Sequence, residues 1–319
     1  MKHVQVRDAL REVDIDKIIV GSHMEQLPEL IIDLILYFTY SYQFKNSDEL
    51  RFAVKGYPQN IKKYGNISYW DVSKITVMNE LFNGSKFTCD ISKWNVSNVT
   101  NMSFMFFESQ FNGDISNWDV SNVADMSAMF YGSKFNSNKF NGDISKWDLS
   151  KVTDMYKMFN GSEFNGDISH WNVLNVTDMY SMFNCSKFNG DISNWNVSNV
   201  TEMSWMFCAS AFNGNISLWD VSKVNNMCDM FSESEFNGDI SRWELANVTN
   251  MNCMFYESKF NGDISNWNVS NVTDMSDMFS MSQFTGDISK WNVSKVTNMS
   301  MMFHNSQFQG DISDWIVKP

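Results

Sequence analysis

Apolar residues recur along most of the chain at one fixed spacing. Tryptophan stands at eleven equivalent places, and every interval between them is 24 residues except one of 29. These positions are Trp70, Trp94, Trp118, Trp147, Trp171, Trp195, Trp219, Trp243, Trp267, Trp291 and Trp315. A unit of this size cannot bury its apolar face alone, so a fixed period of roughly 20–50 residues predicts units stacked into a solenoid.

Each unit contains two apolar segments with different spacing. Trp195 and Val197 are separated by one polar residue, which places both on one face of a short strand. Residues 200–207 place Val, Met and Phe at three- and four-residue intervals, which is typical of a short α-helical or 3₁₀ turn. We therefore predict an α/β solenoid with a parallel sheet on one face and short helical turns on the other.

Polar residues mark the corners and the outer face of this predicted solenoid. In Asn189-Gly190-Asp191, we expect Gly190 to supply a backbone conformation that other residues avoid and Asp191 to bond nearby N–H groups. The residue after each tryptophan is mostly Asn or Asp, as at Asn196. We expect this column to line the outer strand face, with Asn side chains bonded along the stack.

The first part of the chain lacks the repeat. Residues 27–38 read as a buried helix with Pro28 in its first turn, and residues 47–54 begin like an N-capped helix. We predict a small helical N-terminal cap over 1–63 and a repeat solenoid of about ten and a half 24-residue repeats over 64–319. The 29-residue interval duplicates a Lys-Phe-Asn motif, and we expect its extra residues to bulge from a corner.

The net charge and the hydropathy of the chain bear on nucleic-acid binding, membrane insertion and location. The formal charge is −13, and residues 64–319 contain 15 of the 24 basic and 28 of the 37 acidic side chains. An acidic surface repels phosphate backbones, so we expect no nucleic-acid binding. Residues 1–21 lack the apolar core of a signal peptide, and no stretch of ~18 apolar residues exists, so we expect no membrane span and an intracellular location.

Catalytic and metal-binding motifs are not found in the sequence. The four histidines have no neighbouring motif for a metal or a nucleophile, and the five cysteines form no CxxC pair. Their odd number and irregular spacing favour free thiols. One Gly-Asp corner per repeat supplies too few oxygens for calcium, which needs about 6–8 ligands. We therefore expect a protein that is not an enzyme and that has no cofactor or metal.

The repeat motif I-S-x-W-[ND]-V-S-x-V-T-x-M-S-x-M-F resembles the BspA-like surface-protein repeats, which are relatives of the leucine-rich repeats. The resemblance covers residues 64–319 and implies a leucine-rich-repeat-like fold. It also implies a non-enzymatic adhesion or binding protein, often at a cell surface. Separately, residues 27–38 look like the first helix of an F-box, which would imply an adaptor that recruits a ubiquitin ligase.

The candidate binding residues lie outside the predicted core. One set immediately precedes a tryptophan on the strand face: Lys93, Lys146, His170, Arg242 and Lys290. The competing set is Trp205 and Phe104, two large aromatic residues on the helical side. The alternative is that the residues of the charged set are ordinary solvent-exposed positions without a role in binding.

The favoured function is a protein-binding scaffold, with the partner unidentified. Surface adhesion and F-box-type adaptation are the alternatives. The last predicted strand, residues 312–317, has no later repeat to pair with, and Ile316 replaces the usual polar residue there. An unpaired edge is an association site, so we also expect weak end-to-end self-association.

Overall fold

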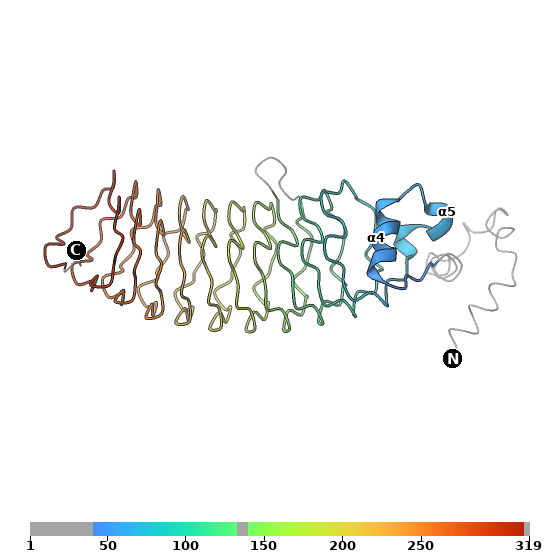
Figure 1. Cartoon of the computed structure of the whole chain (residues 1–319), viewed down its shortest axis with the longest axis horizontal. Helices are drawn as coiled ribbons and strands as arrows, with labels where there is room; N and C mark the ends of the chain where they lie inside the picture. Colours follow the sequence, from blue (N-terminus) through green and yellow to red (C-terminus); the bar gives the residue numbers. More distant parts are fainter. Residues whose placement is uncertain (1–40, 133–139, 316–319) are drawn as a thin grey trace, which may run out of the picture.

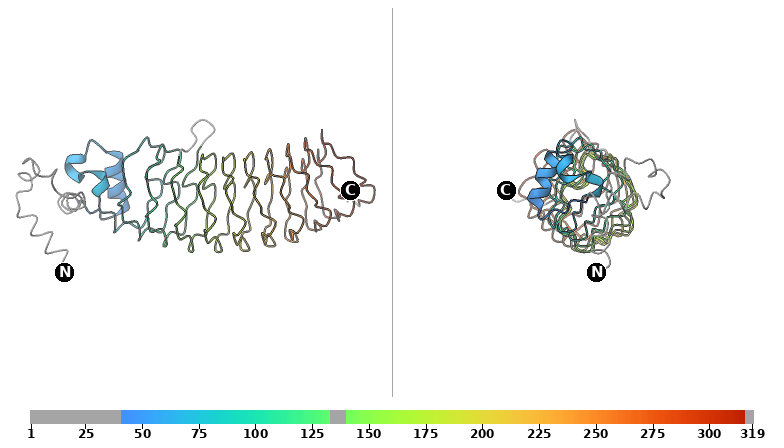
Figure 2. Two further views of the ribbon diagram at one scale, coloured as in Figure 1. Left: turned by 180° about the vertical axis from the view of Figure 1, so that it is seen from behind. Right: turned by 90° about the vertical axis from the view of Figure 1, so that its right-hand side faces the viewer.

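The chain is a row of stacked coils with helices at its N-terminal end (Figure 1). The computed structural model describes residues 41–132 and 140–315. Within them lie helix α4 (Ser47–Lys55), helix α5 (Ile61–Tyr64) and the 3₁₀ helix η2 (Ile67–Tyr69). Seen from behind, the coils lie side by side in one row, and the view along the row shows them one behind another (Figure 2).

Helix α4 covers the open side of the first coil. Its N-terminus is capped by Asn46, whose side chain accepts a hydrogen bond from the backbone N–H of Glu49. Leu50 and Ala53 are buried, and the Ser47 hydroxyl donates to the carbonyl of Val77 at 2.6 Å. The helix expected at 47–54 is therefore present and contacts the repeats. The helix expected at 27–38, with its F-box likeness, lies outside the described residues.

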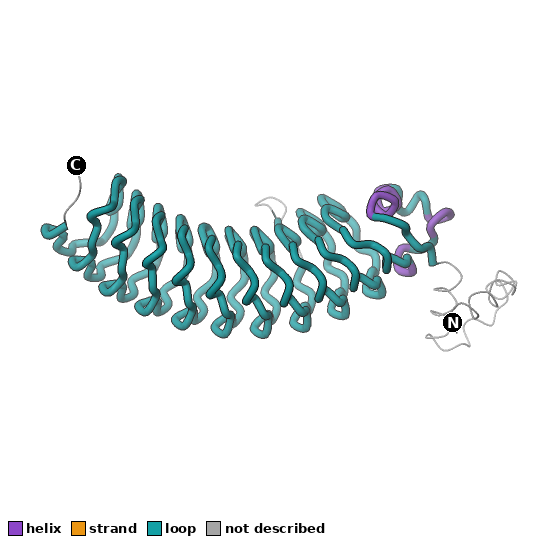
Figure 3. Tube along the Cα trace, turned by 60° about the horizontal axis from the view of Figure 1, so that its bottom comes forward, coloured by secondary structure: helices purple, strands orange, loops and turns teal. Residues whose placement is uncertain are grey.

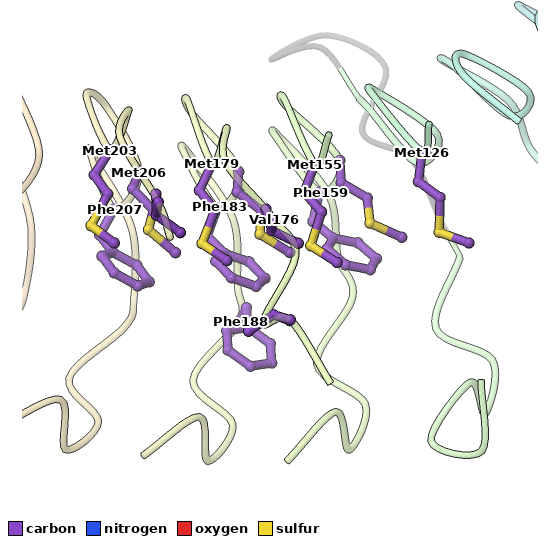
Figure 4. Close-up of a cluster of buried hydrophobic side chains, with 14 of the residues drawn as sticks. Met126, Met155, Phe159, Val176, Met179, Phe183, Phe188, Met203, Met206 and Phe207 are labelled. Atoms are coloured by element: carbon purple, nitrogen blue, oxygen red, sulfur yellow. The ribbon is translucent and has the colours of Figure 1, made fainter. Parts of the chain in front are cut away.

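Every coil directs the same residue types inward. Met and Phe side chains of successive coils repeat one another in columns through the core (Figure 4). The Trp column is equally buried, because Trp70 to Trp291 are each at most 4% exposed, and only Trp315 at the end is partly exposed. The prediction that stacked units bury the apolar face, which includes the tryptophans, is confirmed.

The predicted parallel sheet is wrong. Figure 3 shows loops and turns throughout the coils, and the described residues contain only isolated parallel bridges, such as Asp178 with Glu202, rather than strands. Two short-range hydrogen bonds explain why. The Asp191 side chain accepts from the N–H of Ser193 at 2.9 Å, and the Asn196 side chain accepts from Ser198 at 3.1 Å. Each folds the expected strand into a turn.

Hydrogen bonding also differs from that of a sheet on this side, which we call the Trp leg (residues 192–200 in the central coil). Backbone N–H groups here donate within their own coil, as from Trp195 to the carbonyl of Ile192 at 3.1 Å and from Val200 to that of Val197 at 2.9 Å. Side chains connect the coils instead. The indole N–H of Trp195 donates to the carbonyl of Ile168 at 3.0 Å, and the Asn199 amide donates to the carbonyl of Leu174 at 2.8 Å.

The predicted helical turn is also wrong on the opposite side, which we call the Met-Phe leg (residues 202–210 in the central coil). Trp205 and Ala209 have left-handed backbones, with φ of 61° and 50°. Alternate N–H groups donate to the next coil, as from Phe207 to the carbonyl of Met230 at 3.0 Å. A helix would use those donors internally, so the left-handed residues redirect them between coils.

Asp191 bonds a nearby N–H group at the corner, as predicted. The predictions for Gly190 and for the Asn or Asp column after each tryptophan are wrong. A Cβ at residue 190 would lie 2.9 Å from the Phe188 ring, so glycine is required for space and not for an unusual φ. The Asn196 column bonds within its own coil, which either Asp or Asn can do. The Asn ladder that exists runs one residue before Gly190, where Asn189 accepts from the N–H of Asn213 at 2.8 Å.

The 29-residue coil uses the second copy of its duplicated motif in the ladder. Phe140 is fully buried, and the N–H of Asn141 bonds to the side chain of Asn112 at 3.0 Å. These are the contacts that Phe and Asn make in other coils. The extra residues therefore precede Phe140, and their predicted bulge falls at residues 133–139, outside the described residues.

Candidate functional site

The structure exposes the predicted basic set but does not gather it. Each of its members lies in the turn that precedes a buried tryptophan, on the Trp leg: Lys93, Lys146, His170, Arg242 and Lys290. All five side chains are exposed, and coils with other residues separate several of them. Lys93 lies over the Tyr69 ring at 5.5 Å. The set forms a dispersed row and lines neither of the two cavities described below.

Trp205 and Phe104 occupy the same column of the Met-Phe leg. Both have left-handed φ values, 61° and 56°, and Trp205 is 37% exposed while Phe104 is half-buried. The other eleven of the 12 tryptophans form one column, in which all are buried except the last, Trp315, which is partly exposed. Trp205 is thus the one tryptophan outside that column.

Further aromatic residues lie between these two on the same leg. Phe107 lies 5.6 Å from Phe104 and 4.5 Å from Tyr131, and Tyr156 stacks on Tyr180 at 5.1 Å, all measured between ring centroids. All of these rings are half-buried on the outer side of the coils. We call the following set the aromatic groove: Phe104, Phe107, Tyr131, Tyr156, Tyr180 and Trp205.

A cavity of about 580 Å³ opens within the groove, lined by Tyr131, Tyr180 and Trp205. Gly132 and Gly161, from adjacent coils, also line it. A Cβ on Gly161 would lie 2.1 Å from the carbonyl oxygen of Gly132, so only glycine fits between these coils. Ligand sites of roughly 300–1,000 Å³ with a few polar groups are common, and this cavity falls in that range.

Lys157 lies at the centre of the groove. Its ammonium group is 4.9 Å from the Tyr156 ring centroid and 5.4 Å from that of Tyr180. Burial alone would lower the pKa of Lys157, but a side-chain hydrogen bond with Tyr156 and the nearby Tyr180 and Tyr131 raise it. The side chain therefore stays cationic at neutral pH, held against two rings.

At the rim, Lys187 and Glu163 form an ion pair at 3.4 Å. Both side chains are substantially exposed, so the pair contributes little to stability.

A column of stacked carboxylates borders the groove. Asp154 and Asp178 each accept a hydrogen bond at 2.8 Å from a groove residue, Tyr156 and Tyr180 respectively. Burial raises the pKa of Asp178, and the charges of Asp154 and Glu202 raise it further. Elsewhere in this column an amide relieves such repulsion, as where Asn101 donates to the Asp125 carboxylate at 2.9 Å.

We therefore expect Asp178→Asn to stabilise the fold at pH 7 by about 1 kcal/mol, because the amide can donate to a neighbouring carboxylate and keep its oxygen on Tyr180. The raised folded-state pKa means that Asp178 opposes folding at neutral pH and that this penalty disappears as pH falls through that pKa. Urea unfolding at pH 7 and at pH 4 measures the difference. A gain that is equal at both pH values would contradict the assignment.

The corner aspartates carry the opposite pH dependence. The pKa of Asp191 is lowered by its hydrogen bonds from the backbone and side chain of Ser193, and Asp263 is lowered in the same way by Ser265. Their contribution is present above the ordinary aspartate pKa of about 3.9 and is lost as pH falls through the depressed values. The corner hydrogen bond expected for this column is confirmed.

The C-terminal end of the stack holds a second cavity, of about 460 Å³, lined mostly by apolar residues such as Ile312 and Trp315. Met301 is 61% exposed there. In the preceding coil, Asp277 and Phe279 donate their N–H groups to the last described coil. That coil has no later coil to bond within the described residues.

The predicted self-association can be tested at this end, although Ile316 itself lies outside the described residues. We expect weak end-to-end association at high concentration, relieved by Ile316→Asp and equally by Met301→Asp, because a charge there opposes burial of the apolar end. Sedimentation velocity over a concentration series measures it, with the exposed Leu218→Asp as the control. A strict monomer at hundreds of micromolar would contradict the prediction.

In the part of the chain that the structure describes, no three His, Cys, Asp or Glu side chains are grouped to hold a metal ion. Among the same residues, no helix has the length and apolar character needed to cross a bilayer. Burial raises the pKa of the Cys208 thiol, on the Met-Phe leg, to about 12. Such a thiol stays protonated at neutral pH and is a poor nucleophile.

A family model described as "Mycoplasma protein of unknown function, DUF285" matches the chain four times. The matches cover residues 50–139, 134–236, 184–282 and 227–319. They overlap and extend over the whole repeat region, which confirms the tandem repeats that the tryptophan spacing predicts. No curated protein and no solved structure matches the chain.

Proposed function

We propose that this chain, which belongs to the family described as Mycoplasma protein of unknown function, DUF285, is a non-enzymatic scaffold that binds a protein partner in the aromatic groove. The observation that carries the proposal is that three outward aromatic side chains, Tyr131, Tyr180 and Trp205, line one cavity, with Phe107 and Tyr156 stacked on two of them. The inward columns already complete the core, so these rings are not needed to fill it. Large, partly exposed aromatic residues commonly dominate binding energy at protein interfaces.

The Met-Phe leg also offers a rigid base for a binding site. N–H groups on this leg donate to the next coil, as from Lys157 to Tyr180 at 2.8 Å and from Trp205 to Cys228 at 2.8 Å. Side chains on such a backbone lose less conformational entropy when a partner binds, which favours affinity. The dispersed basic set of the Trp leg lines neither of the two described cavities, so we propose the site on the Met-Phe leg.

The test compares two sets of substitutions after a partner has been identified by pull-down and mass spectrometry. The charge set is Lys146→Glu, Arg242→Glu and Lys290→Glu, and the aromatic set is Phe104→Ala and Trp205→Ala. We expect the aromatic set to weaken binding at least about 30-fold, since interface hot spots cost about 2 kcal/mol or more each. The charge set should bind normally. The opposite result would place the site on the Trp leg.

Surface adhesion is the second candidate, favoured by the resemblance to BspA-like repeats and consistent with the family match. It predicts the same groove but a different location. Fractionation of cells, followed by protease treatment of intact cells, separates the two: a surface adhesin is cleaved, whereas an internal scaffold is protected.

A further inference from the structure

We propose that the cavity around Lys157 binds a carboxylate of the partner, namely an Asp or Glu side chain within an extended peptide segment whose apolar neighbours contact Trp205 and Tyr180. This inference rests on the proposed function and assigns the chemistry of the partner at the groove. Three observations carry it: the state of Lys157, the shape of the cavity and the charge distribution along the leg.

Lys157 is a cation held in place without a carboxylate partner among the described residues. Its ammonium contacts the rings of Tyr156 and Tyr180, and its aliphatic stem is partly buried, so its position is restricted before any ligand arrives. By contrast, Lys187 and Lys259 are paired with glutamates. An incoming carboxylate would form a charge-assisted hydrogen bond with a group that needs little reorganisation.

The cavity accommodates more than one side chain. Its volume is about 580 Å³, and its lining residues come from adjacent coils, from Tyr131 to Trp205. Its other polar groups are uncharged, apart from the Lys187–Glu163 pair at the rim. This arrangement combines one central charge with flanking aromatic surfaces, which suits a peptide that has an acidic residue between apolar ones.

The charge distribution restricts such a peptide to one register. Farther along the same leg, the corresponding columns contain Asp229, Glu233, Glu257 and Asp277. Nearer the cavity, Asp154 and Asp178 lie in the bordering column, where their oxygens accept backbone hydrogen bonds. Acidic groups repel a carboxylate placed beside them, so the later coils that carry Asp229, Glu233, Glu257 and Asp277 disfavour the ligand, whereas Lys157 favours it.

The experiment uses a displayed library of random peptides selected against the full chain, followed by synthesis of the enriched peptides. Binding is measured as a change in the fluorescence of Trp205. The Trp205→Phe variant should not show this change. We expect enriched peptides to contain Asp or Glu, and the matching Gln or Asn peptide to bind at least about tenfold more weakly. Lys157→Met, which keeps an unbranched stem, should cause the same loss for the acidic peptide and almost none for its amide counterpart.

Lys223→Met is the matched control, because Lys223 bonds to the Asn199 side chain on the Trp leg. It should leave binding unchanged, and thermal melts of every variant verify folding. If Lys157→Met has a lowered melting temperature, Lys157→Gln replaces it in the same comparison of the acidic peptide with its amide counterpart. Equal binding of the acidic peptide and its amide counterpart overturns the inference.

The failure of the inference is distinguishable from that of the proposed function. If enriched peptides lack acidic residues but still require Trp205 and Tyr180, the groove is a peptide site and only the carboxylate assignment falls. If peptides bind equally well to a chain carrying Phe104→Ala, Tyr180→Ala and Trp205→Ala, the proposed function falls as well. Saturable binding of free glucuronate without enrichment of acidic peptides overturns the peptide assignment in favour of an acidic sugar.

Discussion

Trp195→Ala is expected to lower the free energy of unfolding by about 4 kcal/mol, whereas Trp205→Ala lowers it by less than about 1 kcal/mol. The two residues lie in one coil and undergo the same chemical change. Trp195 is 3% exposed, whereas Trp205 is 37% exposed. Removing the Trp195 indole leaves a cavity between stacked rings and also leaves the buried Ile168 carbonyl without its 3.0 Å hydrogen bond.

Urea unfolding followed by circular dichroism measures this difference. Because each coil contacts only its neighbours, we also expect the central substitution to divide the transition into two. An unchanged dependence of the free energy of unfolding on urea concentration would exclude this division. Trp205→Ala is the internal control for loss of an indole without loss of the ladder. A loss under 1 kcal/mol at Trp195 would mean that the ladder contributes little.

The repeat and its core could be predicted from the sequence, but the path of the backbone could not. Spacing of apolar residues identifies which side chains face inward, and Trp195 and Val197 do so. It does not distinguish a strand from two successive turns that direct the same side chains inward. The Asp191-x-Ser193 and Asn196-x-Ser198 pairs are present in the sequence, and their local hydrogen bonds produce turns where we predicted a strand.

The left-handed positions of the Met-Phe leg have no compositional signature. The column contains Phe104, Lys157 and Trp205, among other residues, although glycine is the residue that best tolerates a positive φ. Each such residue costs of order 1–3 kcal/mol of strain, and hydrogen bonds to the next coil offset that cost. Because the compensation comes from the neighbouring coil, a single unit read by itself cannot reveal it.

The candidate site was found in part. The sequence analysis selected Trp205 and Phe104 as large aromatic residues on the helical side, but it did not select Tyr156, Tyr180 or Lys157. The two tyrosines occupy a column that contains serine in several other coils, so they depart from the repeat and could have been identified. The cavity itself could not, because it depends on the close approach of two glycines from adjacent coils.

That approach leads to the second large prediction, which concerns Gly161→Ala and Gly84→Ala. Both glycines have φ of 63° and both donate their N–H to the next coil, so the strain of a left-handed alanine is common to them. We expect Gly84→Ala to cost about 1 kcal/mol, because nothing lies within 4 Å of its new Cβ. Gly161→Ala should cost at least about 3 kcal/mol, since its Cβ would lie 2.1 Å from the Gly132 carbonyl oxygen.

The difference between the two variants isolates the contact between coils. A backbone carbonyl cannot rotate away as a side chain can, so relief requires the coils of Gly132 and Gly161 to separate. That separation weakens the 2.7 Å hydrogen bond between them, which the Gly132 N–H donates to the carbonyl of Asn160. Separation also deforms the cavity, so Gly161→Ala should weaken binding of the selected peptides, whereas Gly84→Ala should not. Urea unfolding of both variants, alongside peptide titration, gives the comparison. Equal destabilisation would show that the coils slide apart at little cost and that the glycine pair does not shape the groove.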